Sequence, residues 1–231
     1  MNFGPAERFR ALQQQYSDPA LTLLTVLLLL LMFVVAPLQA TGFLAFQGGF
    51  GVVVAVVMIG GVLVISGSVV AATTTLIAFS LIVVVLILRL RNEPSAYDLY
   101  FVAVAWLTLS MVLGWAVAQA VFAPGRVSYH RIVGAVLLYL LIALTFMALY
   151  LFVGLLIPKA FSGIVFEDNT ALASSLIYFS FVTLTTVGYG DILPIHPIAR
   201  TLCNLESIFG QLYPATLLAR LVTLEVEGRR R

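Results

Sequence analysis

Apolar residues along this chain gather into long runs, which polar segments separate. A helix needs about 20 apolar residues to cross the hydrocarbon core of a bilayer. By that length we expect six transmembrane helices, over residues 20–36, 44–66, 69–88, 98–122, 131–157 and 197–224. The second and third form one run that is too long for a single crossing, and we divide it at Ser66-Gly67-Ser68, where small polar residues permit a tight turn. The pattern predicts an all-α membrane protein.

Residues 1–18 differ from these runs because they are polar. Phe9, Leu12 and Tyr16 lie at helical spacing, which is typical of a short amphipathic helix at the membrane surface. A solvated tail is the alternative. We expect the apolar run that follows to be retained as a helix, because it is longer than the core of a signal peptide and Leu38 fits a cleavage site poorly.

The segment between the fifth and sixth predicted helices has a different character. Residues 158–170 are mixed and polar, and the apolar residues 171–184 are too few to cross a bilayer. Residues 185–191, with the sequence TTVGYGD, follow. A short helix and a glycine-containing turn between two spans are typical of a re-entrant loop, because irregular backbone at membrane depth needs protein or a water-filled cavity around it. We therefore expect residues 171–184 to form a re-entrant helix.

The composition indicates that lipid is the solvent of this chain. Hydrophobic residues make up 62% and charged residues 10%, whereas soluble domains have roughly 45–50% and 25%. Cys203 is the one cysteine, so it cannot form an intrachain disulfide, and we expect it to be a small packed hydrophobe. The net charge is +2 without a long basic run, which gives no support to nucleic-acid binding.

The sequence Thr186-Val187-Gly188-Tyr189-Gly190 resembles the selectivity filter of the potassium channel family. The resemblance extends over residues 131–224, and the earlier helices resemble those of six-helix members only in number and order. It implies a potassium channel subunit of the bacterial six-helix type, with a pore helix and filter between the fifth and sixth helices. It also implies a homotetramer in the lipid bilayer, K+ ions in the filter and no organic cofactor.

Backbone carbonyls explain how such a segment selects K+. A K+ ion without its water needs a cage of oxygens, and carbonyls provide strong dipoles without net charge. Successive carbonyls of an extended chain point in opposite directions, so alternate residues must be left-handed to aim them all inward. Gly188 and Gly190 can do this without the cost of a Cβ, and Thr186 can add its hydroxyl at the inner end. The resemblance assigns the K+-coordinating carbonyls to Thr186, Val187, Gly188 and Tyr189.

Residues around the filter are expected to support it, and by the resemblance these are Thr185, Asp191, Tyr178, Phe179 and Val182. Tyr189 is expected to point away from the ions and to pack against Tyr178 and Phe179. Asp191 follows the filter at its outer mouth, where a carboxylate attracts cations and can accept a hydrogen bond from Tyr178. Val182 stands where some bacterial members have a glutamate, so a carboxylate pair with Asp191 is absent here.

The two ends of the pore helix are expected to have separate roles. Asp168, Asn169 or Thr170 is expected at its N-terminus, where their side chains can cap a helix. Its C-terminus would direct carbonyl dipoles at a water-filled cavity. The partial negative charge there favours a cation.

The filter sets the expected orientation, because pore loops of this family enter from the outside. Both ends of the chain are then cytoplasmic, in a multi-pass protein of the plasma membrane, or of the inner membrane in a bacterium. Most arginines outside the spans then lie inside, as the positive-inside rule requires; they are Arg8, Arg10, Arg126, Arg131, Arg229, Arg230 and Arg231. Arg89 and Arg91 lie outside against the rule, although Glu93 and Asp98 leave that loop neutral.

Residues 99–122 of the fourth predicted helix contain no charges. Voltage sensing needs several charges that move through the field, so we expect little of it here. We divide the chain into an N-terminal cytoplasmic segment 1–18, a four-helix domain 19–125 without voltage-sensor arginines and a pore domain 126–231. We expect no soluble ligand-binding domain in the chain.

Four residues near the predicted pore are candidates for gating. Gly210 matches the position of the hinge glycine in related channels, and both Gly210 and Pro214 allow a helix to bend. Close packing at a small residue is the alternative for Gly210. Glu206 is an intramembrane carboxylate, which either faces the cavity or ties the sixth helix to a neighbour. His196 at the outer mouth either senses external pH or is an ordinary loop histidine.

Two other functions are weighed against a channel. Gly188-Tyr189-Gly190-Asp191 also resembles the Gly-x-Gly-Asp motif of intramembrane aspartyl proteases, with Asp98 and Asp191 as the catalytic acids. Both aspartates lie at the ends of spans, and the protease gives the preceding TTV sequence no role, so we expect no enzyme. A non-conducting subunit, or a cation channel of lower selectivity, is the other alternative, and the intact filter argues against it.

Overall fold

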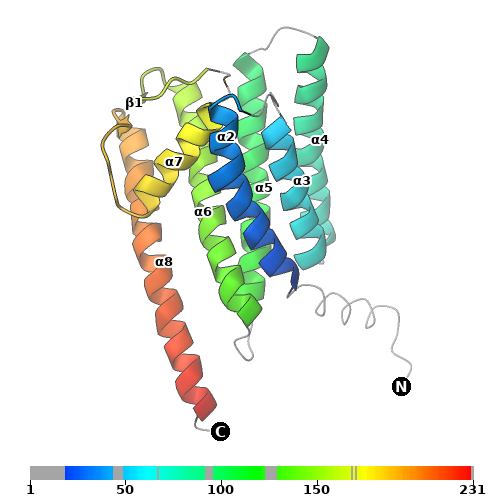
Figure 1. Cartoon of the computed structure of the whole chain (residues 1–231), viewed down its shortest axis with the longest axis vertical. Helices are drawn as coiled ribbons and strands as arrows, with labels where there is room; N and C mark the ends of the chain where they lie inside the picture. The colour runs from blue at the N-terminus through cyan, green and yellow to red at the C-terminus, as the bar shows by residue number, and fades with distance from the viewer. Residues whose placement is uncertain are drawn as a thin grey trace, which may run out of the picture.

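The computed structural model describes residues 19–43, 49–66, 68–91, 96–122, 129–167, 169 and 171–229. The predicted amphipathic segment 1–18 lies outside these residues. Long helices that alternate in direction form a bundle, with one short tilted helix near one end (Figure 1). The described part therefore has the all-α architecture that the apolar runs predict.

The first helix covers Pro19–Ala40 and includes a π-helical turn, η1 (Leu31–Val35), and α2 (Ala36–Ala40). The remaining elements are α3 (Gly49–Ile65), α4 (Val69–Arg91), α5 (Ala96–Phe122), α6 (Tyr129–Leu156), β1 (Phe161–Ser162), α7 (Leu172–Leu184), β2 (Leu193–Pro194) and α8 (Pro197–Arg229). The predicted break between the second and third helices is confirmed, because α3 ends just before Ser66 and α4 begins just after Ser68.

Within the described residues, four helices are long and apolar enough to cross a membrane; they are Pro19–Ala40, Val69–Leu88, Tyr97–Phe122 and Tyr129–Leu156. The described part of α3 has 17 residues, fewer than the predicted 44–66, and residues 44–48 lie outside the described part. α8 has 33 residues but is not apolar enough to count, since polar side chains such as Asn204, Glu206 and Gln211 interrupt it. The six predicted helices are thus present, and four meet the criteria of a span.

The first helix runs further than the predicted 20–36, because it continues through Pro37. Proline has no N–H and cannot donate to a carbonyl of the preceding turn. The helix widens into the π-helical turn just before Pro37, where the N–H of Ala36 donates to the carbonyl of Leu31. Such a π-turn accommodates the proline without ending the helix. The predicted helix ended before Pro37, whereas the observed helix forms a π-helical turn there and continues to Ala40.

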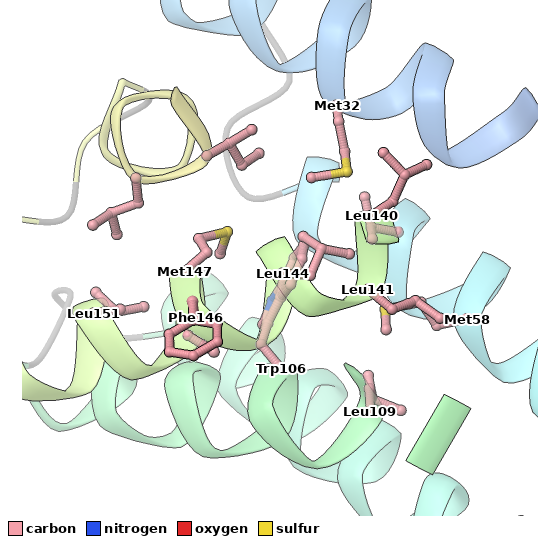
Figure 2. Close-up of a cluster of buried hydrophobic side chains, with 14 of the residues drawn as sticks. Met32, Met58, Trp106, Leu109, Leu140, Leu141, Leu144, Phe146, Met147 and Leu151 are labelled. Carbon is pink, nitrogen blue, oxygen red and sulfur yellow. The ribbon is translucent and has the colours of Figure 1, made fainter. Parts of the chain in front are cut away.

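The core lies between the first helix, α3, α5 and α6, and α5 packs along both α3 and α6. Figure 2 shows side chains from these helices pointing toward one another; those labelled are Met32, Met58, Trp106, Leu109, Leu140, Leu141, Leu144, Phe146, Met147 and Leu151. The Tyr100 hydroxyl in α5 donates to the Leu155 carbonyl in α6 at 2.6 Å. The predicted four-helix domain 19–125 (the four-helix part) and the predicted pore domain 126–231 (the pore part) therefore share one core.

The chain between α6 and α8 leaves one end of the bundle and returns to it. β1 follows α6 and pairs antiparallel with β2, which precedes α8. The N–H of Ile195 also donates to the carbonyl of Ala160 at 2.8 Å. Between the strands, α7 descends part-way along α6, and the following residues come back to the same end (Figure 1). This excursion places α7 against both α6 and α8 and leaves the TTVGYGD segment exposed beside α8.

The first helix reaches α7 as well as α6. Near the start of the helix, the side chains of Thr22 and His130 share a hydrogen bond of 2.8 Å. Near its other end, the ring of Phe33 lies 4.9 Å from that of Phe181 in α7. The first helix therefore packs against both α6 and α7.

Candidate functional site

The short helix α7 begins at an asparagine cap. Asn169 Oδ1 accepts hydrogen bonds from the N–H groups of Ala171 and Leu172, at 3.0 and 2.8 Å. These bonds satisfy two of the N–H groups that a helix start leaves without partners. Of the three predicted capping residues, Asn169 is the one that the structure describes, and its side chain accepts these bonds. Asp168 and Thr170 lie outside the described residues.

The C-terminal carbonyls of α7 hold the start of the TTVGYGD segment. The N–H of Thr185 donates to Phe181 at 2.9 Å, and that of Thr186 donates to Thr183 at 3.0 Å. The Val182 carbonyl accepts from the N–H groups of Val187 and Gly188. These bonds turn the chain sharply at the end of α7. The segment is therefore anchored to the helix through its backbone.

Alternate residues of the segment have left-handed backbone conformations. The φ angles are +59° at Thr186, +58° at Gly188 and +83° at Gly190. The prediction for the two glycines is confirmed. Thr186 was not predicted to be left-handed, although counting back from Gly188 in steps of two would have found it. A positive φ at a β-branched residue is unusual, so neighbouring contacts must hold Thr186 in place.

Tyr178 connects α7 with the end of the segment. Its ring stacks on that of Tyr189 with the centroids 6.3 Å apart and the planes at 2°. The Asp191 carboxylate lies near its hydroxyl and raises the pKa of Tyr178. The predicted contact of Tyr178 with Tyr189 is therefore found, and its hydrogen bond to Asp191 stays a prediction. Phe179 lies on another face of α7, buried 4.9 Å from the ring of Tyr150, so it does not join the Tyr178–Tyr189 stack.

Glu206 lies buried between three helices, with 0% of its surface exposed. Its Oε2 accepts a hydrogen bond from the Tyr150 hydroxyl of α6, and its Oε1 lies 2.5 Å from Ser180 Oγ of α7. Ser180 Oγ also lies 2.8 Å from the carbonyl oxygen of Ala143. Of the two roles considered for Glu206, this placement favours the tie between helices, because a fully buried side chain does not line a cavity.

The number of protons in this cluster favours a neutral Glu206. The Ser180 hydroxyl has one proton, yet two acceptors lie within hydrogen-bond distance of it. A proton on Glu206 Oε1 would donate to Ser180, leaving the Ser180 proton for Ala143. Every polar atom of the cluster then has a partner, as buried groups require. An ionised carboxylate at the same place would be costly without a cation.

Gly210 packs against the end of α7. A Cβ on Gly210 would collide with the carbonyl oxygen of Leu184, which is backbone and cannot easily move aside. One turn earlier, Ser207 Oγ donates to the Thr183 carbonyl at 3.3 Å. The alternative of close packing for Gly210 therefore has direct support. A hinge at Gly210 and Pro214 stays a prediction, and Pro214 lies inside the continuous helix α8.

Gln211 contacts the TTVGYGD segment directly, which sequence reasoning did not anticipate. Its Nε2 donates to Thr186 Oγ1 at 3.0 Å.

His196 lies after the TTVGYGD segment, and its Nδ1 accepts from the N–H of Ile198 at 3.3 Å. His196 thus helps to begin α8. Its role as a sensor of external pH stays a prediction.

The structure also describes three further residues that the sequence singled out: Asp98, Arg91 and Cys203. Asp98 is buried in the first turn of α5, near the end of α6 that leads to α7. α4 ends at Arg91, shortly before α5, so Arg89 and Arg91 lie at this end of the bundle. Within the described residues, no group of three or more His, Cys, Asp or Glu side chains could hold a metal ion. Cys203 is free and buried, as expected.

Comparison with known proteins identifies the part of the chain that holds this site. Residues 134–227 match a protein family described as "Ion channel". The match includes most of α6, all of α7, the TTVGYGD segment and nearly all of α8, and it supports a channel subunit in a multi-pass membrane protein. It gives no support to the protease alternative with Asp98 and Asp191.

A shorter similarity exists to Protein LctB of Bacillus caldotenax, with 36% identity over 56 residues. These residues are 24% of this chain and 41% of that protein, so the chain spans about two fifths of the relative's length. No solved structure matches the chain. The ion channel family match covers residues 134–227, in the second half of the chain.

Proposed function

We propose that this chain is one subunit of a potassium-selective channel, in which four copies surround a pore that passes K+ down its gradient. The alternation of left-handed residues at Thr186, Gly188 and Gly190 is the observation that carries the proposal. A chain with this alternation can present successive carbonyls to one side, which an extended strand cannot do. A row of carbonyls on one side is what a dehydrated K+ ion needs.

The ions would be held by the carbonyl oxygens of Thr186, Val187, Gly188 and Tyr189, with the Thr186 hydroxyl at the inner end. Gly190 would complete the turn at the outer end. These carbonyls replace the hydration shell of K+ without adding net charge, so an ion binds and still leaves. Asp191, near the Tyr178 hydroxyl, would attract cations to the outer mouth.

One chain supplies one wall of such a cage, and the exposed apolar surface beside it suits further copies. Val187 is 53% and Tyr189 72% exposed in the single chain. The adjoining face of α8 also exposes large apolar side chains; among them are Ile208, Phe209 and Leu212. In a bilayer such side chains can pack against neighbouring copies as well as against lipid. Four copies with these faces in contact would surround one axis.

In this proposal α3 and α8 cross the membrane together with the four helices that meet the criteria of a span. α7 and residues 185–191 then form a re-entrant loop, which protein and water surround. The start of the first helix and the end of α8 lie at the bundle end away from α7 (Figure 1). Both would be cytoplasmic in the plasma membrane, or in the inner membrane of a bacterium.

Flux of K+ and Na+ into liposomes that contain the purified full chain tests the proposal. We expect the wild type to pass K+ and to exclude Na+. The substitution Gly188→Ala should abolish K+ flux or its selectivity, because an alanine is strained at φ +58°.

Gly60→Ala is the matched control, since a Cβ on Gly60 meets nothing within 4 Å. It should behave as the wild type. Equal K+ and Na+ flux through the wild type would favour the alternative of a less selective channel. Absence of any flux would favour a non-conducting subunit.

A further inference from the structure

The contact between Gln211 and Thr186 joins α8 to the first residue of the TVGYG sequence. The amide Nε2 of Gln211 donates to Thr186 Oγ1 at 3.0 Å. Both side chains are exposed in the single chain. A hydroxyl oxygen has two lone pairs and one proton. Gln211 therefore occupies one lone pair of the Thr186 hydroxyl and leaves the other free.

Packing of α8 against α7 fixes the position from which Gln211 reaches Thr186. Gly210 lies so close to the Leu184 carbonyl that no side chain fits between them. Ser207, one turn before Gln211 on the same face of α8, donates to the Thr183 carbonyl. Two independent contacts thus set the rotation of α8 at this level. The Gln211 side chain is presented to the segment as a result.

Thr186 is the residue of the segment that most needs such a contact. Its φ of +59° is in the left-handed region, which a β-branched residue rarely adopts. Such a conformation persists only when the surroundings determine it. Its N–H bond to the Thr183 carbonyl fixes the backbone, and the Gln211 bond fixes the side chain. Together they determine where Thr186 Oγ1 lies.

We propose that Gln211 is a positioning residue of the inner end of the filter. By donating to Thr186 Oγ1, it holds the hydroxyl oxygens of four subunits at the distance from the axis at which they bind a cation. The inference rests on the proposed function, because it requires that cations pass Thr186. It assigns part of the affinity for the innermost cation to α8, which carries none of the TVGYG residues.

Block of K+ current by Ba2+ from the cytoplasmic side measures the inner end of the filter. Ba2+ is a divalent cation close to K+ in size, so the same oxygens hold it more tightly. The variants are Gln211→Met, which keeps length and loses the amide, and Gln211→Asn, which keeps the amide but is too short. Gln119→Met is the control, because Gln119 is exposed on α5, far from the filter in sequence. All are measured as full chains in planar bilayers.

We expect both Gln211 variants to weaken Ba2+ block by about tenfold, because four displaced hydroxyl oxygens together would lose about 1.4 kcal/mol of cation affinity. The control should be blocked as the wild type. Ordinary structural damage would lower the yield of tetramer without changing the block of the channels that form.

Unchanged Ba2+ block in Gln211→Asn and Gln211→Met would overturn the inference while leaving the proposed function intact. Wild-type block in Gln211→Asn alone would also contradict it, since polarity rather than the bond would then matter. If neither variant assembles, Gln211 is needed for folding and not for ion affinity. A wild type that does not select K+ would instead refute the proposed function.

Discussion

At the scale of single residues, the polar groups of the pore part are arranged in two separate sets. One set, Thr186 with Gln211, lies at the exposed TTVGYGD segment. The other, Glu206 with Tyr150 and Ser180, is buried behind it. The first can act on ions under the proposed function. The second connects α6, α7 and α8 and has no exposed polar atom on Glu206.

The buried set makes a prediction about Glu206. Glu206→Gln should keep the thermal stability and conductance of the wild type, because an amide can donate to Ser180 and accept from Tyr150 as a neutral carboxyl does. Glu206→Ala should lower the free energy of unfolding by about 1–3 kcal/mol for each hydroxyl left without a partner. Thermal melting of the purified protein measures both effects.

Glu167→Ala provides the control, because it removes a carboxylate that is exposed to solvent. It should melt as the wild type. A large loss of conductance in Glu206→Gln without a loss of stability would contradict the buried placement, since it would mean that the charge of Glu206 acts on ions.

At the scale of elements, the apolar runs predict where the helices lie. They do not predict which side chains of neighbouring helices come into contact. The length of each run depends on local composition, so α4, α5 and α6 lie close to their predicted bounds. The glycine spacing in TTVGYGD likewise indicates the left-handed residues. The passage of the first helix through Pro37 could not be predicted, because it depends on a π-turn that the sequence does not signal. The partners of Glu206 and Gln211 depend on how α7 is tilted against α8.

The close contact between α7 and α8 makes a prediction about Gly210. Gly210→Ala should destabilise the folded protein by about 1–3 kcal/mol, because the added Cβ overlaps the Leu184 backbone and α8 must move away. Thermal melting compares it with Gly60→Ala, for which no such contact exists.

Unchanged stability in Gly210→Ala would contradict the close contact between α8 at Gly210 and the Leu184 carbonyl of α7. A change in open probability for this variant would not by itself demonstrate a hinge, because displacement of α8 would also disturb Thr186 through Gln211. Pro214→Ala is the better variant for the predicted hinge, since it changes helix flexibility one turn further from α7.

At the scale of the whole molecule, the pore part is supported by the rest of the chain. The first helix contacts α6 through Thr22 and His130 and contacts α7 through Phe33 and Phe181. α5 packs along α6 in a shared core. The described helices therefore form one body, within which the TTVGYGD segment is exposed on one side. The proposed function requires that four such bodies place these segments around a common axis, where their carbonyls pass K+ and exclude Na+.

The reversal potential of the reconstituted channel, with K+ on one side of a planar bilayer and Na+ on the other, tests this claim most directly. A K+-selective pore should give a strongly displaced potential whose sign corresponds to movement of K+ alone. A reversal potential near zero would contradict it, because K+ and Na+ would then pass equally well and no ring of carbonyls would be selecting between them.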